Sequence, residues 1–299
     1  MGTDLLTALR PLGTELVPAL FEGTLGLFAP LAPRPTPDVC AVERDIAYGS
    51  DVRHRMDIFH PPAGITTAGQ RAVVVFVHGG GFVRGDKGAP EAPFYNNVGA
   101  WAVLNGLIGV TITYRLAPDS RWPAGAEDVA SALEWLAANV AQFGADPARL
   151  FLMGQSAGAV HVAGYVTGQH GRAAPRVAGA MMLSGIYDVL SLKRSPFEDA
   201  YFGAERELSR DPSTLTGLVT TDTACLFTVS ELDPPTFQQQ ASRLVAAHWE
   251  TRGRLPRLLY QQAHNHLSPI LQLGTPYDTL GGELLAFMRR VPSGTPAQR

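Results

Sequence analysis

A serine lies at the centre of a glycine-rich motif, Gly-Gln-Ser-Ala-Gly, at residues 154–158. An apolar run at 150–153 precedes the motif, and residues 157–169 are suited to a helix. The pattern G-x-S-x-G between a strand and a helix makes a sharp turn that exposes the serine hydroxyl. Small flanking residues let the two elements approach, and the helix dipole favours negative charge that develops nearby. We therefore predict that Ser156 is a nucleophile; the alternative is an ordinary glycine-rich turn.

A second glycine-rich segment, His-Gly-Gly-Gly-Phe, occupies residues 78–82 directly after the apolar run 72–77. Three glycines let the backbone approach a substrate closely, so N–H groups of this loop could hold a developing oxyanion. A phosphate-binding loop is the alternative, but the Gly-Lys-Ser/Thr ending of such loops is missing. The candidate oxyanion donors are the N–H groups of Gly80, Gly81 and Ala157.

An acid and a base are required as well. A serine hydroxyl is unreactive at neutral pH unless a base takes its proton, and the base needs a carboxylate to orient it. Where the serine lies on a strand-to-helix turn of this kind, the acid and then the histidine follow it along the chain. Asp233 follows the apolar run 225–229 and is the predicted acid, with Glu231 as the alternative.

Two histidines, His264 and His266, follow the apolar run 257–260 and are the candidates for the base. Ser268 and the proline after it have the chemistry of a helix start, with Ser268 as the N-cap. His266 would then be held by a rigid element, as a base that must keep its aim requires. We predict His266 as the base and keep His264 as the alternative. The other histidines are interpreted as surface, packing or loop-shaping residues: His54, His60, His78, His161, His170 and His248.

Strand-like and helix-like segments alternate along most of the chain. Continuous apolar, β-branched runs indicate strands that are buried on both faces, and the segments between them are suited to helices. We therefore predict an α/β fold with a mostly parallel central sheet and helices on both faces. The predicted strands are 72–77, 107–114, 150–153, 177–183, 225–229 and 257–260, and the predicted helices are 90–104, 128–143, 157–169, 236–251 and 277–290.

Three segments lie outside this alternation. Residues 1–37 combine short amphipathic helices with a run of prolines, and they are predicted to form an N-terminal helical arm or cap with a proline-rich linker. Residues 190–222 interrupt the strand–helix pattern and are predicted to be a cap insertion within a catalytic domain of residues 38–291. Residues 292–299 are predicted to be a flexible tail.

The composition argues against several classes of protein. The chain has 299 residues and a net charge of −3, and its basic residues are scattered, so no nucleic-acid partner is expected. Asp4 and Arg10 interrupt an apolar N-terminus that lacks the basic start of a signal peptide, which predicts a soluble, cytoplasmic protein with no membrane span. Cys40 and Cys225 make no disulfide framework, and no metal-ligand spacing is present, so we expect no metal and no organic cofactor.

Further motifs carry a family resemblance. The chain has Tyr-Arg-Leu-Ala-Pro at 114–118, Trp-Pro-Ala at 122–124, Glu-Asp at 127–128 and Asp-Pro at 233–234. Together with the two glycine-rich motifs, these segments resemble the esterase/lipase branch of the α/β hydrolases, which includes the hormone-sensitive-lipase-like carboxylesterases. The resemblance covers roughly residues 40–290.

Two features depart from that pattern. Gln155 stands where many hormone-sensitive-lipase-like enzymes have Asp before the nucleophile. The segment 78–87 and the ending His-Asn-His at 264–266 look closer to esterases related to kynurenine formamidase. An ester oxygen and an amide nitrogen therefore both remain candidates for the leaving atom.

The resemblance implies an α/β-hydrolase fold that cleaves small-molecule carboxylic esters through an acyl-enzyme, with Ser156, His266 and Asp233 as the triad. The alternatives are an arylformamidase or another amidase with the same machinery, and a ligand-binding module on a hydrolase scaffold. The amphipathic arm must bury its apolar face against the active-site mouth or a second subunit, so a homodimer is one expectation. No long apolar lid is visible, and short-chain or small aryl esters are expected because three aromatic residues could crowd the pocket: Phe82, Trp122 and Phe202.

Overall fold

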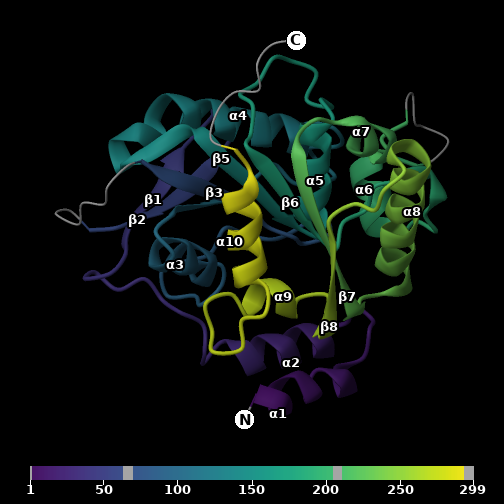
Figure 1. Cartoon of the computed structure of the whole chain (residues 1–299), viewed down its shortest axis with the longest axis horizontal. Coiled ribbons are helices and arrows are strands. Elements are labelled where there is room, and N and C mark those ends of the chain that lie inside the picture. The colour runs from purple at the N-terminus through teal and green to yellow at the C-terminus, as the bar shows by residue number, and fades with distance from the viewer. Residues whose placement is uncertain (1, 63–69, 205–210, 293–299) are drawn as a thin grey trace.

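The computed structural model describes residues 2–62, 70–204 and 211–292. Its centre is one eight-stranded sheet with the strand order β1-β2-β4-β3-β5-β6-β7-β8 (Figure 1). Strands β3 to β8 run parallel, and β2 and β1 are added antiparallel at one edge, so the predicted α/β fold with a mostly parallel sheet is confirmed. The strands are β1 (Ala41–Ala47), β2 (Arg55–His60), β3 (Arg71–Val77), β4 (Ile108–Ile112), β5 (Ala145–Gln155), β6 (Gly179–Leu183), β7 (Ala224–Leu232) and β8 (Leu258–Asn265).

The parallel strands match the apolar runs of the sequence because both of their faces are covered. Val73, Val75 and Val77 of β3 join one core cluster, whereas Val74 and Phe76 join the cluster on the opposite face. The antiparallel strands β1 and β2 were not predicted. Strand β1 has three successive charged residues, Glu-Arg-Asp, and its residues are exposed or half-buried, so no continuous apolar run marks it.

Helices cover both faces of the sheet. One core cluster joins the sheet to α4 (Ala124–Asn139) and α5 (Ala157–Val166). The opposite cluster joins it to α3 (Asn96–Leu104), α9 (Ser268–Leu271) and α10 (Gly281–Arg290), and Figure 1 shows α3 and α10 lying across that face. Helix α8 (Pro235–Arg252) and the short α7 (Leu215–Thr220) pack against each other beside β7.

The N-terminal arm consists of α1 (Gly2–Thr7), a 3₁₀ turn at Arg10–Leu12 and α2 (Pro18–Phe28). Pro18 begins α2 and does not break it, because the first residue of a helix has no intrahelical N–H bond to lose. Leu20 and Phe28 are fully buried in the cluster that includes α9 and α10, so the arm is part of the folded unit.

The described part of the segment 190–222 consists of two short helices with irregular stretches around them. It contains α6 (Pro196–Phe202) and α7, while residues 205–210 lie outside the described residues. Of the predicted tail, residues 293–299 also lie outside them. No helix in the described part of the chain is long and apolar enough to cross a membrane, and no group of metal-binding side chains occurs there.

A buried ionic cluster ties the unpredicted edge of the sheet to the loop after β3. The carboxylate of Asp57 is fully buried and lies 2.6 Å from Arg44 Nη1 and 2.9 Å from Lys87 Nζ. It also accepts a hydrogen bond from the backbone N–H of Asp45. Lys87 lies in the loop that follows β3, five residues after the glycine-rich segment 78–82. The cluster therefore holds this loop against strand β2.

We expect Asp57→Asn to destabilise the protein by about 3 kcal/mol or more, because breaking a buried ion pair leaves an uncompensated charge. Urea unfolding measures the loss. The matched control is Asp86→Asn, because Asp86 is exposed and lies 3.8 Å from Arg53, and such a surface pair contributes at most about 1 kcal/mol. Equal losses in the two variants would contradict a special role for Asp57.

Candidate active site

The turn between β5 and α5 holds Ser156 in a backbone conformation that side chains rarely adopt, with φ 57° and ψ −119°. A Cβ atom at Gly154 would lie 2.3 Å from the carbonyl oxygen of Gly158, and one at Gly158 would lie 2.0 Å from the carbonyl oxygen of Val77. Both distances are too short for any side chain. The motif therefore serves a close approach of strand, helix and turn, as predicted, and it presents the hydroxyl of Ser156 at the end of β5.

The glycine-rich loop after β3 folds back on itself. Gly80, Gly81 and Phe82 all have positive φ, and a Cβ atom at Gly80 would lie 2.0 Å from the carbonyl oxygen of Arg84. Gly80, Gly81 and Ala157 line the same cavity as Ser156. Within the described residues, the N–H groups of these three have no protein acceptor, so each is available to a bound oxygen atom.

His78 is fully buried and supports the glycine-rich loop from its inner side. Its Nδ1 atom lies 2.6 Å from the carbonyl oxygen of Gly79, and its ring stacks on Tyr114 with centroids 4.3 Å apart. Burial lowers the pKa of His78 to about 3, so the ring is neutral. This environment supports the interpretation of His78 as a loop-shaping residue.

The predicted acid and base lie together at the carboxyl ends of β7 and β8. His266 Nδ1 is 2.6 Å from Asp233 Oδ1, and both side chains are buried. The second carboxylate oxygen of Asp233 accepts hydrogen bonds from Ser184 Oγ at 2.7 Å and from the N–H of Ser230 at 2.6 Å. Three donors on one buried carboxylate hold it in place. No motif pointed to Ser184, which directly follows β6.

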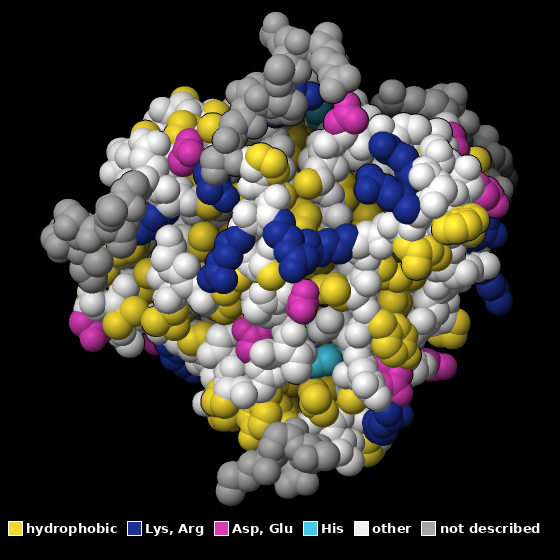
Figure 2. Space-filling model, viewed as in Figure 1, with side chains coloured by type: hydrophobic (Ala, Val, Ile, Leu, Met, Phe, Trp, Pro, Cys, Tyr) yellow, Lys and Arg dark blue, Asp and Glu magenta, His cyan; other side chains and the backbone are white. Residues whose placement is uncertain are grey.

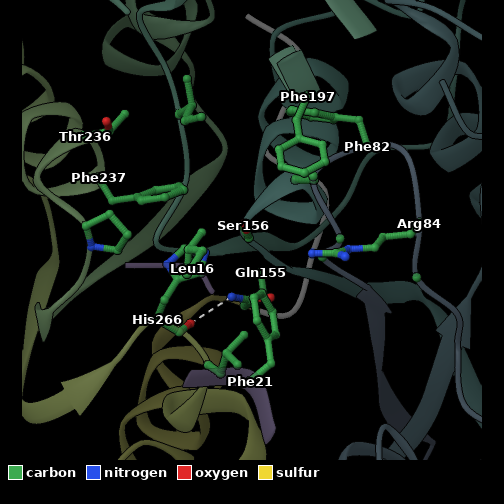
Figure 3. A pocket seen from close by; sticks show the side chains of 18 of the residues that line it. Leu16, Phe21, Phe82, Arg84, Gln155, Ser156, Phe197, Thr236, Phe237 and His266 are labelled. Carbon is green, nitrogen blue, oxygen red and sulfur yellow. Dashed lines mark hydrogen bonds between the residues drawn. The ribbon is translucent and has the colours of Figure 1, made fainter. Parts of the chain in front are cut away.

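The remaining ring nitrogen of His266 is available to the cavity. Its Nε2 atom is buried and has no hydrogen-bond partner among the described residues. His266 and Ser156 both line the cavity, and Figure 3 shows them near one another. In structures without substrate, the hydrogen bond between nucleophile and base is often long or poorly aligned and tightens when substrate binds.

The alternative acid and base have other contacts. Glu231 accepts hydrogen bonds from Arg10 Nη2 and from the N–H of Ala263, each at 2.7 Å. His264 lies 2.9 Å from Ser268 Oγ and 3.2 Å from Thr279 Oγ1 with its two ring nitrogens, and it does not line the cavity. Burial lowers the pKa of His264 to about 4. The geometry thus favours Asp233 and His266 over these two.

The expected N-cap next to the base was wrong. Helix α9 begins at Ser268, which is its first residue, with Leu267 before it. The side-chain oxygen of Asn265 accepts hydrogen bonds from the N–H groups of Leu267 and Ser268, at 3.1 and 3.0 Å. An Asn side chain satisfies helix-start donors as well as a Ser side chain does, and here it stands nearer to the strand.

Gln155, which departs from the pattern of the related family, connects the turn at Ser156 to the backbone of His266. Its side chain is buried, and its Nε2 atom donates a hydrogen bond of 2.9 Å to the carbonyl oxygen of His266, drawn as a dashed line in Figure 3. A carboxylate at this position could not donate such a bond. The residue before the nucleophile therefore holds the backbone of the predicted base.

These groups surround a cavity of about 530 Å³, which is within the usual range for small-molecule sites. Figure 3 shows aromatic side chains from several elements around it. The arm and the segment 190–222 were expected to form a cap, but the residues that they contribute to the cavity, and those at the start of α8, were not predicted. The apolar residues that line the cavity include Leu16, Phe21, Leu25, Phe82, Ile186, Phe197, Phe237, Leu267 and Ile270.

Of the three predicted pocket aromatics, only Phe82 lines this cavity. Phe202 is buried behind it, with the two ring centroids 5.5 Å apart. The indole N–H of Trp122 donates a hydrogen bond to Gln169 Oε1 at 2.9 Å, away from Ser156. We therefore correct the prediction for Trp122 and Phe202, which pack behind the wall of the cavity. His161 packs there too, with Tyr201, and burial lowers its pKa to about 3.

His266→Ala should lower kcat on the order of 10⁴-fold or more, because members of one catalytic unit fail together. His264→Ala should lower kcat far less, since its two ring nitrogens bond to Ser268 and Thr279. Steady-state kinetics on the folded fraction of each variant separates lost chemistry from lost stability. The opposite order of losses would make His264 the base.

Gln155→Met should lower kcat about ten- to a hundredfold, because the reaction is sensitive to small displacements of a catalytic group. Gln169→Met is the matched control, since Gln169 Nε2 also donates to a backbone carbonyl, that of Pro212, at 2.8 Å. Both variants should lose about 1–3 kcal/mol of stability in urea unfolding if the freed carbonyl is buried. Only Gln155→Met should lower kcat. If Gln169→Met lowered kcat by a similar factor, the loss in Gln155→Met would follow from reduced stability and not from the displaced backbone of His266.

Comparison with known proteins places this arrangement in a family. A family model described as the alpha/beta hydrolase fold matches residues 74–238. A carboxylesterase of Mycobacterium tuberculosis, NlhH, is 35% identical over 128 residues, which are 42% of this chain and 37% of that protein. A probable isoprenylcysteine alpha-carbonyl methylesterase of Arabidopsis thaliana is 37% identical over 125 residues, which are 40% of this chain and 26% of that protein. The matched region thus spans well under half the length of these relatives.

Solved structures extend the likeness to nearly the whole chain. Esterase B from Lactobacillus rhamnosis has a TM-score of 0.74 at 16% identity, covering 97% of this chain and 96% of its own. A bacterial heroin esterase has a TM-score of 0.67 at 20% identity, covering 97% of this chain and 98% of its own. At this level of identity the likeness concerns the fold, whereas the family model covers more than half of the sequence. The chain therefore belongs to the α/β-hydrolase family.

Proposed function

We propose that this protein is a carboxylesterase that cleaves small-molecule esters through an acyl-enzyme on Ser156. The single observation that carries the proposal is the buried pair of His266 and Asp233, with Nδ1 of the ring 2.6 Å from Oδ1 of the carboxylate. The other ring nitrogen of His266, Nε2, has no partner among the described residues, and His266 lines the same cavity as Ser156. The names of the relatives support ester hydrolysis as the reaction class, since they include a carboxylesterase and a methylesterase.

The first half of the reaction forms the acyl-enzyme. His266 Nε2 takes the proton of the Ser156 hydroxyl while the serine oxygen bonds to the ester carbonyl carbon. The carbonyl oxygen becomes negative and accepts hydrogen bonds from the N–H groups of Gly80, Gly81 and Ala157. Each such donor can contribute on the order of 10²- to 10³-fold in rate. The carbon–oxygen bond to the alcohol then breaks, and the alcohol leaves with the proton from His266.

The second half releases the acid. Water gives a proton to His266 Nε2 and attacks the acyl carbon, and the collapse of the second tetrahedral intermediate returns the proton to Ser156. Asp233 orients the ring by accepting a hydrogen bond from Nδ1–H and stabilises the imidazolium that forms twice per cycle. Ser184 and the N–H of Ser230 keep the carboxylate aimed at the ring.

The acyl side of the site favours short acyl groups or small aryl groups in our proposal. Phe82 and Ile186 are buried and line the cavity, and Tyr201 stacks on the back of Phe82 with centroids 4.5 Å apart. A wall supported in this way cannot move back easily to admit a long chain. We also propose that the arm, residues 1–37, acts as a cap together with α6, because both contribute residues to the cavity wall.

Ser156→Ala should abolish hydrolysis of p-nitrophenyl acetate, with a loss on the order of 10⁴-fold or more. Ser131→Ala is the control serine, because it lies on α4 and does not line the cavity. Circular dichroism and the melting temperature check that both variants fold. If Ser156→Ala kept more than a tenth of the wild-type rate, the proposal would be wrong. Hydrolysis of N-formylkynurenine by the wild-type protein, measured beside the ester, tests the formamidase alternative.

The acyl preference is tested with p-nitrophenyl esters of increasing acyl length. We expect kcat/KM to be highest for acetate to butyrate and to fall for longer chains, because the wall formed by Phe82 and Ile186 is backed by buried side chains. A rate maximum at about ten or more acyl carbons, where each buried methylene adds to binding, would contradict the small acyl site.

A further inference from the structure

A second apolar groove adjoins the cavity at its mouth. It has a volume of about 490 Å³ and lies between the arm and α6. Four of the residues that line it also line the cavity: Leu16, Phe21, Arg84 and Phe197. The groove is therefore a continuation of the cavity beyond these side chains. Pro18 and Glu22 of α2 complete its lining.

The partition between cavity and groove is built around Arg84. Its guanidinium carbon lies 5.4 Å from the ring centroid of Phe21 and 5.8 Å from that of Phe197. Arg84 is exposed, and it has no hydrogen bond and no ion pair among the described residues. Only the two ring contacts hold the side chain where it is, and cation–π contacts at exposed sites are weak. A ligand can displace it at little cost.

Two apolar side chains at this place are exposed to solvent beside the opening of the cavity. Leu16 is 39% exposed and Phe197 is 44% exposed, although both could be covered by a ligand that follows the groove. They come from segments far apart in the sequence and flank the same opening, as Figure 3 shows for Leu16, Phe21 and Phe197. Contiguous exposed apolar surface of this kind marks a binding site.

The position of the base identifies which part of an ester would enter the groove. His266 gives its proton to the leaving alcohol, so the alcohol must lie on the His266 side of Ser156. Helix α2 contacts α9, which begins two residues after His266, and Phe21 of α2 borders both the cavity and the groove. The path from the leaving oxygen along α2 therefore leads past Phe21 and into the groove.

We propose that the cavity and the groove form one channel for the alcohol part of the ester, and that the natural substrate carries an extended apolar alcohol on a small acyl group. This inference rests on the proposed esterase function. It assigns the arm a role in selecting the alcohol, while the small acyl site by Phe82 selects the acid.

The test is a series of acetate esters of straight-chain alcohols from ethyl to decyl, followed by acid release in a pH-stat below the micellar concentration of each ester. We expect kcat/KM to rise with length by at most about fourfold per methylene, mainly through KM, until the groove is full. A flat series overturns the channel while leaving the esterase function intact. If no acetate is hydrolysed at all, it is the esterase function that fails.

Glu22→Trp places a large side chain in the groove, and Ala19→Trp places one on an exposed position of α2 that lines neither space. The ratio of kcat/KM for octyl over ethyl acetate should fall about tenfold or more in Glu22→Trp, which corresponds to losing a few buried methylenes, and stay unchanged in Ala19→Trp. An unchanged ratio in Glu22→Trp overturns the proposal. A change in oligomeric mass with an unchanged ratio also overturns the proposal, because the groove would then be a contact between copies. A length effect that is seen only above the micellar concentration of the esters overturns it as well.

Discussion

The close approach of the backbones of β3, β5 and α5 at Ser156 is the constraint on which the rest of this structure depends. The carbonyl oxygen of Val77 lies where a Cβ atom of residue 158 would be, and the carbonyl of residue 158 lies where a Cβ atom of residue 154 would be. Strands β3 and β5 and helix α5 can meet at this distance only with glycine at both positions. The strained φ of Ser156 persists because the strand and helix on either side are fixed by burial in the core. The adjacent ends of β3 and β5 then place the glycine-rich loop beside Ser156.

Beyond this turn, buried polar contacts connect the carboxyl ends of the neighbouring strands and hold their side chains in place. Gln155 reaches the carbonyl of His266, Asp233 holds the ring of His266, and Ser184 holds Asp233, so neighbouring strand ends are connected through side chains. Each group is buried, and a broken contact would leave a polar atom without a partner, which costs more than the contact itself contributes. These contacts hold the side chains of Asp233 and His266 in place, which is the preorganisation that an acid–base pair would need.

The parallel core could be predicted from the sequence because its pattern is local, and local motifs also singled out Ser156, Asp233 and His266, which the structure brings together. Apolar runs mark strands buried on two faces, and the glycines around Ser156 indicate a tight turn between a strand and a helix. Strand β1 escaped prediction because its partly exposed residues include three charges, and strand β2 because the buried charge of Asp57 interrupts its apolar residues. The pocket residues were predicted less well. Phe202 and Trp122 are aromatic and near the site in the fold, but a helix seven residues long decides that Phe197 lines the cavity while Phe202 packs behind it. Which face of such a helix turns to the cavity depends on tertiary packing, and no spacing rule reveals it.

The buried histidines behind the site have a consequence for proton binding. His78, His161 and His264 are all surrounded by protein, and burial lowers the pKa of each, to about 3, 3 and 4. In the unfolded chain an imidazole has its ordinary pKa of about 6.5. Below that pH the unfolded chain binds protons that the folded chain refuses, so acid shifts the equilibrium toward unfolding, increasingly as the pH falls from about 6.5 to 4. Histidines that do not line the cavity thereby make this fold less stable in acid.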